Sequence, residues 1–73
     1  MAEEKINMVG KVNAGYTITK QGSNAVIAHN PNAPSPYVAW SYNPKTGDCF
    51  WGNYCNTEET AEKYFNKKEN IGI

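Results

Sequence analysis

Residues 37–54 read YVAWSYNPKTGDCFWGNY and contain the clearest hairpin pattern of the 73-residue chain. Residues 37–42 and 49–54 are rich in aromatic and β-branched side chains, which favour strands. Between them, Pro44 sets φ for the first corner of a turn, and Gly47 can take the left-handed conformation that a hairpin needs. This stretch therefore predicts two antiparallel strands joined by a turn.

An earlier pair of strands is predicted on the N-terminal side. Residues 16–20 (YTITK) and 25–29 (AVIAH) are separated by turn residues at 21–24, which indicates a first hairpin. Three prolines lie between residues 30 and 36, and proline restricts regular structure. We interpret this segment as a stiff crossing loop between two hairpins.

A helix is predicted at the C-terminal side. Asn56 or Thr57 can cap it, and Glu58 and Glu59 follow in the first turn, where the helix dipole favours acidic residues. The fold class is therefore α+β: a small antiparallel sheet of three or four strands in two hairpins, with one C-terminal helix packed on one face. A single domain over 1–73 is expected, with a loose N-terminal arm or edge strand at 1–14, the sheet at 15–55 and the helix at 56–69.

The register of the second hairpin divides its side chains between two faces. If Asn43 pairs with Asp48, then Trp40 lies opposite Trp51, and Tyr42 lies on the same face. The other face combines small residues with aromatic ones, and we expect the helix to pack there: Tyr37, Ala39, Ser41, Phe50, Gly52 and Tyr54. Only the N-terminal segment is then left to cover Trp40, Trp51 and Tyr42.

The composition excludes several classes of protein. Seven Lys balance seven acidic residues and there is no Arg, so a strongly basic nucleic-acid binder is excluded. No run of 18 apolar residues predicts a membrane span, and no apolar segment near the N-terminus predicts a secretory signal. Cys49 and Cys55 would lie about 20 Å apart on one extended strand, too far for a disulfide. Two free thiols predict a cytoplasmic location.

Catalytic and metal-binding patterns are weak. His29 is the only histidine, and with Cys49 and Cys55 it offers three zinc ligands at spacings unlike those of structural zinc sites. The single Asp, Asp48, belongs to a different hairpin from His29, so a Ser–His–Asp arrangement is not expected. The sequence therefore predicts no enzyme activity, no metal and no cofactor.

Two resemblances arise from the same part of the chain. Residues 33–40 (APSPYVAW), with WGNY at 51–54 and TEE at 57–59, resemble small uncharacterised proteins carried by conjugative transposons of Gram-positive bacteria. These proteins share a Pro-x-Pro-Tyr-Val-x-Trp strand and a Trp-Gly-x-Tyr strand before a short helix. Their resemblance implies a mobile-element context but no mechanism. The Lys-Thr-Gly turn at 45–47 and TEETAE at 57–62 are also similar to the arm-type DNA-binding domain of tyrosine recombinases, which implies a sheet that binds the major groove.

The aromatic face leaves three interpretations open. It can be core, covered by the N-terminal segment, because tryptophan must fill space in a chain without Leu. It can bind another protein or a second copy of this chain, which is our leading hypothesis, through Trp40, Trp51 and Tyr42 with Tyr37 and Tyr54 next to them. It can stack nucleic-acid bases, and the phosphate contacts would then come from Lys45, Lys63, Lys67 and Lys68.

Overall fold

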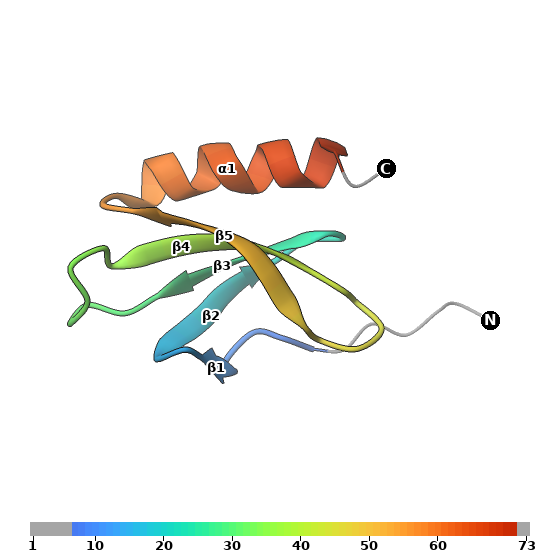
Figure 1. The fold of residues 1–73 in the computed structure, drawn as a ribbon, viewed down its shortest axis with the longest axis horizontal. Helices are drawn as coiled ribbons and strands as arrows, with labels where there is room; N and C mark the ends of the chain where they lie inside the picture. Colours follow the sequence, from blue (N-terminus) through green and yellow to red (C-terminus); the bar gives the residue numbers. More distant parts are fainter. Residues whose placement is uncertain (1–6, 72–73) are drawn as a thin grey trace.

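The computed structural model describes residues 7–71. Its elements are β1 (Val12–Asn13), β2 (Tyr16–Gln21), β3 (Ala25–His29), β4 (Tyr37–Tyr42), β5 (Cys49–Cys55) and α1 (Glu58–Ile71). Each strand pairs antiparallel with the next one along the chain, and the sheet curls into a half-barrel with α1 across its convex side (Figure 1). The predicted α+β class and C-terminal helix are confirmed, but the sheet has five strands rather than three or four.

Two connections explain the larger sheet. Ala14 and Gly15 both have positive φ, 54° and 86°, which is the conformation of a two-residue hairpin turn, so Asn13 pairs back onto Tyr16. The proline-rich segment is not a crossing between separate hairpins, because β3 and β4 are direct neighbours. Its ends are joined by a hydrogen bond of 2.7 Å from Asn30 N to Pro36 O.

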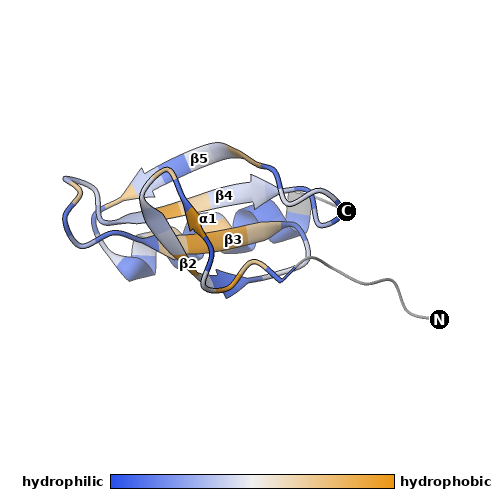
Figure 2. Ribbon diagram, turned by 90° about the horizontal axis from the view of Figure 1, so that it is seen from below, coloured by the Kyte–Doolittle hydropathy of each residue, from blue (hydrophilic) through white to orange (hydrophobic). Residues whose placement is uncertain are grey.

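The concave face of the sheet carries the larger hydrophobic cluster. Seen from the side opposite α1, hydrophobic residues concentrate along β3 (Figure 2). The N-terminal segment covers part of this face: Met8 is buried, its N–H donates to Gln21 Oε1 at 2.9 Å, and Gly10 N donates to Ile18 O at 2.8 Å. Of the loose arm or edge strand predicted at 1–14, the edge strand is present as β1, and Met8, Gly10 and Lys11 are hydrogen-bonded to β2. Residues 1–6 lie outside the described part. The cluster comprises Met8, Tyr16, Ile18, Val26, Ala28, Val38, Trp40 and Tyr42.

The convex face packs against α1. Thr57 caps the helix, since its Oγ1 accepts a hydrogen bond from Thr60 N at 3.3 Å. Ala61 and Phe65 are the buried apolar residues of the helix. The sheet residues buried against the helix are Ala25, Ile27, Ala39 and Cys55, with Tyr37 at the border.

Within residues 7–71, no helix combines the length and the apolar character needed to cross a membrane.

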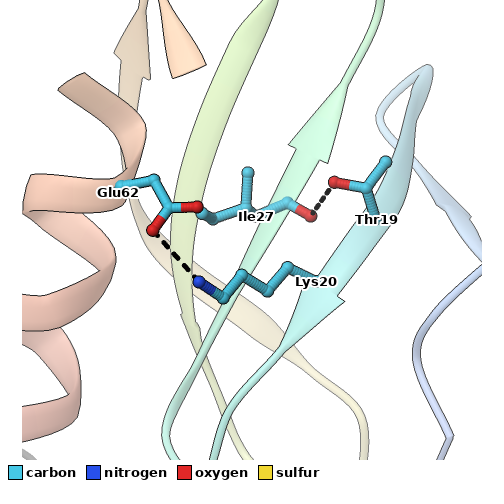
Figure 3. Close-up of polar contacts among 4 residues, drawn as sticks. All are labelled: Thr19, Lys20, Ile27 and Glu62. Carbon is cyan, nitrogen blue, oxygen red and sulfur yellow. Dashed lines mark hydrogen bonds and ion pairs between the residues drawn. The ribbon is translucent and has the colours of Figure 1, made fainter. Parts of the chain in front are cut away.

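An irregularity in β2 turns one lysine towards the helix. Ile18 pairs with Ala28 but Lys20 pairs with Ile27, so Thr19 is an extra residue in β2. Lys20 therefore shares the convex face with Ile27, and its Nζ lies 3.0 Å from Glu62 Oε1 (Figure 3). Thr19 Oγ1 donates to Ile27 O at 3.3 Å in the same region. This bulge links β2 to α1 across β3.

Glu69 fixes the C-terminal end of α1 to the β2–β3 turn. Its carboxylate accepts hydrogen bonds from three consecutive backbone N–H groups, those of Ser23 at 3.0 Å, Asn24 at 2.7 Å and Ala25 at 2.8 Å. Gly22 leaves the space for this approach, because a Cβ there would lie 2.6 Å from Glu69 Cδ. Three donors on one carboxylate make this the most concentrated polar contact between helix and sheet among the described residues.

Candidate interaction surface

A bulge in β5 decides which aromatic side chains reach solvent. Ser41 pairs with Phe50, but Ala39 pairs with Asn53, so two residues of β5, Trp51 and Gly52, stand opposite Trp40. The regular register predicted for this hairpin is therefore correct only up to the bulge. Beyond it, every β5 residue lies on the face opposite to the predicted one.

Gly52 takes the place under Trp40 that the regular register would give to Trp51. A Cβ on Gly52 would lie 2.6 Å from Trp40 Nε1 and 2.7 Å from Trp40 Cδ1, so the indole packs directly on the glycine backbone. The prediction that Gly52 makes room for the helix is wrong, because it makes room for Trp40 on the concave face. The bulge thus puts Gly52 in the position under Trp40 and leaves Trp51 outside the core.

A Gly52→Ala variant is expected to lose about 1–3 kcal/mol of the free energy of unfolding, the usual cost of overpacking. Gly52 is not among the residues with positive φ, so the added methyl group acts through space alone. Urea denaturation followed by circular dichroism measures the loss. Combining Gly52→Ala with Trp40→Phe should cost less than the sum of the single changes, because the smaller ring relieves the clash. Additive costs would contradict this packing.

Trp51 is the most exposed large hydrophobic residue of the described part of the chain. It is 76% exposed, and its φ of 53° places it in the left-handed region, which is rare for a bulky residue. Its ring packs on the edge of Phe50, with centroids 5.1 Å apart and planes at 82°, and Phe50 is itself 40% exposed. Such backbone conformations cost about 1–3 kcal/mol and concentrate at functional sites. We refer to Phe50 and Trp51 as the β5 patch.

The other predicted aromatic residues do not form one exposed surface. Trp40 and Tyr42 are core residues, so their assignment to a binding face is wrong. Tyr37 belongs to the helix side, where its ring stacks on His29 with centroids 4.5 Å apart. Tyr54 is 54% exposed on the concave side, against the edge of Tyr16 at 5.7 Å, and not on the predicted helix face. Of the five predicted anchors, Trp51 alone belongs to the β5 patch.

The four predicted phosphate-binding lysines lie on two elements on different sides of the sheet. Lys45 is in the β4–β5 turn, which lies away from α1, whereas the other three belong to the helix (Figure 1). Lys67 Nζ lies 5.9 Å from the Tyr64 ring centroid, and Lys63 is exposed. Lys68 has a different role from the predicted one, because its Nζ donates to Trp51 O at 2.6 Å. Desolvation lowers the pKa of the Lys68 ammonium below its ordinary value.

The thiols and the histidine do not form a reactive centre in the described residues. Cys49 and Cys55 are both free and lie at opposite ends of β5. Burial raises the pKa of both thiols, and Asp48 adds to the effect at Cys49, so the nucleophilic thiolate is disfavoured. No three His, Cys, Asp or Glu side chains gather in residues 7–71 where they could hold a metal. The absence of enzyme activity stays a prediction.

Sequence reasoning missed Phe50 and the role of Lys68. A signal for the bulge was present, because an isolated glycine inside a strand often marks a bulge or the close approach of another group. The contact of Lys68 has no such signal, since it joins residues 17 positions apart through tertiary packing. Comparison of the chain with protein-family models, curated proteins and solved structures gave no match.

Proposed function

We propose that this protein is a non-enzymatic interaction module that self-associates through the β5 patch. The observation that carries the proposal is Trp51, a tryptophan placed in solvent by a bulge and held at positive φ on an edge strand. Tryptophan is the residue most enriched at the energetic centres of protein interfaces. A fold that keeps one of its two tryptophans outside the core, in an unfavourable backbone conformation, retains it for a contact with another molecule.

A second copy of the chain is the partner that the charges favour. The chain has no formal net charge, so two copies do not repel each other through their overall fields. β5 carries no charged side chain over its seven residues, unlike the charged edges by which proteins usually prevent association. With a two-fold axis perpendicular to β5, the strand runs antiparallel to its copy, so Lys45 before one β5 approaches Glu58 and Glu59 after the other.

Side-chain contacts, rather than a continuous backbone ladder, are expected to hold the two copies together. The bulge interrupts the edge of β5 at its centre, and Lys68 already occupies the carbonyl oxygen of Trp51. The aromatic rings of Phe50 and Trp51 stand clear of this interruption. A two-fold contact would bring each β5 patch against the same patch of the other copy.

Sedimentation equilibrium from roughly 1 μM to 1 mM tests the proposal, a range that covers association free energies of about 8 to 4 kcal/mol. We expect the apparent mass to rise from 8.1 kDa towards that of a dimer with increasing concentration. Trp51→Gly should abolish this rise while increasing the stability of the monomer by about 1 kcal/mol, because glycine accepts the left-handed conformation. Such a gain in stability with a loss of association is the mark of a functional residue.

Val12→Ala provides the matched control, because Val12 is an exposed apolar residue on β1, at the opposite edge of the sheet. It should leave association unchanged. A wild-type chain that stays monomeric over the whole range, or a Trp51→Gly chain that still associates, would overturn the proposal.

A gel-shift titration with single-stranded and duplex DNA tests the alternative, a nucleic-acid role. Salt-dependent binding by a monomer, lost in Trp51→Gly and weakened in Lys67→Met, would replace the proposal with a nucleic-acid role.

A further inference from the structure

We infer that Lys68 is a positioning residue: by holding the carbonyl oxygen of Trp51, it fixes the direction in which the indole meets a second copy. The inference rests on the proposed self-association for its consequence, but the contact itself belongs to the single chain. It gives α1 a role in the interaction surface besides covering the sheet.

The geometry supports this role. Lys68 Nζ and Trp51 O are 2.6 Å apart. Lys68 belongs to α1 and Trp51 to β5, and these two elements are in contact. The carbonyl of Trp51 belongs to the peptide group that joins it to Gly52. Holding that oxygen therefore restrains the peptide plane at the bulge, which contains the Trp51 Cα from which the side chain projects.

The other contacts at the bulge do not set the orientation of the Trp51 ring. The register that excludes Trp51 from the core is set on the other face, where Trp40 packs on Gly52. That contact determines that Trp51 lies outside, but not where its ring points. Within residues 7–71, the one aromatic ring in contact with Trp51 is that of Phe50, which is partly exposed itself. Among the described residues, Lys68 supplies the one side-chain hydrogen bond to Trp51.

The helix offers a matched control for charge. Lys67 belongs to the same helix and carries the same charge as Lys68, but its Nζ lies over the ring of Tyr64 and not at Trp51. Lys67→Met and Lys68→Met therefore remove the same charge from the same end of α1. Lys68→Arg retains a donor at the position and tests whether the hydrogen bond, rather than the aliphatic stem, is responsible.

The experiment measures order in the dilute monomer and association separately. Nitrogen-15 relaxation of the Gly52 amide reports on the same peptide plane as the Trp51 carbonyl. In Lys68→Met we expect its order parameter to fall from about 0.85 to below about 0.6, whereas Lys67→Met should leave it unchanged and Lys68→Arg should keep it near the wild-type value. Association of Lys68→Met should weaken by about three- to tenfold, the cost of ordering one large side chain when the copies meet.

Several results would overturn the inference. An unchanged Gly52 amide in Lys68→Met would mean that the bulge is rigid without the lysine. An equal loss of order in Lys67→Met would point to a general effect on α1. Tighter association of Lys68→Met would mean that Lys68 shields the edge of β5 instead of orienting Trp51. If the wild-type chain proves monomeric, the proposed function fails, and the Gly52 amide then decides by itself whether Lys68 positions Trp51.

Discussion

Trp40→Ala is expected to remove about 3–5 kcal/mol of the free energy of unfolding, the usual cost of deleting a buried aromatic side chain. Trp40 is only 5% exposed, and its ring meets the edge of Tyr16 with centroids 5.9 Å apart and planes at 79°. It also covers Gly52 at the bulge. Because domains of this size have only roughly 4–11 kcal/mol of stability, the variant should be close to unfolding at room temperature.

Urea denaturation followed by circular dichroism tests this expectation, and Trp51→Ala is the matched control. The same deletion at Trp51 removes an exposed side chain, so its effect should remain within about 0.5 kcal/mol. Acrylamide quenching of the wild-type monomer should show one shielded and one accessible tryptophan. Equal losses of stability in the two variants, or two equally accessible tryptophans, would mean that Trp40 is not the core residue described above.

The sequence alone predicts that the two tryptophans share one face of the sheet, whereas the structure separates them. Regular alternation assigns Trp40 and Trp51 to one face, and the alternation holds for Tyr42 opposite Cys49 and Ser41 opposite Phe50. A single extra residue then reverses the face of all that follows. The Trp40 indole favours this shift, because it lies so close to the backbone beneath it that a side chain there would clash. That requirement comes from pairing across strands, which a pattern along one strand does not contain.

Local signals were sufficient elsewhere in the fold. The observed β3 and β4 have the predicted bounds, Ala25–His29 and Tyr37–Tyr42, because turn residues or prolines flank both strands. The cap at Thr57 followed from residue type and position. Met8 shows the opposite case: its burial depends on the curl of a sheet formed by later residues, and nothing in its own neighbourhood marks it as core.

Glu69→Ala is expected to lower the free energy of unfolding by about 2–3 kcal/mol, because hydrogen bonds to a charged group contribute roughly 1.5–3 kcal/mol and three donors lose their acceptor together. The donors are the backbone N–H groups of Ser23, Asn24 and Ala25. Glu69→Gln should lose less, since its amide oxygen still accepts from the turn. Thermal and urea denaturation of both variants measure the difference.

Glu62→Ala is the control, because it removes the same charge from the same helix. Glu62 pairs with Lys20 at the surface, where both side chains are more than a third exposed, and such pairs contribute about 0–1 kcal/mol. A loss at Glu62 as large as that at Glu69 would show that net charge on α1, and not the three N–H donors, determines the effect.

If Glu69 is the main attachment, Glu69→Ala should also increase amide exchange at the C-terminal turns of α1 before global unfolding, while β3 stays protected. The end of the helix that carries Lys68 is thus held by Glu69, so loosening it should also disturb Trp51.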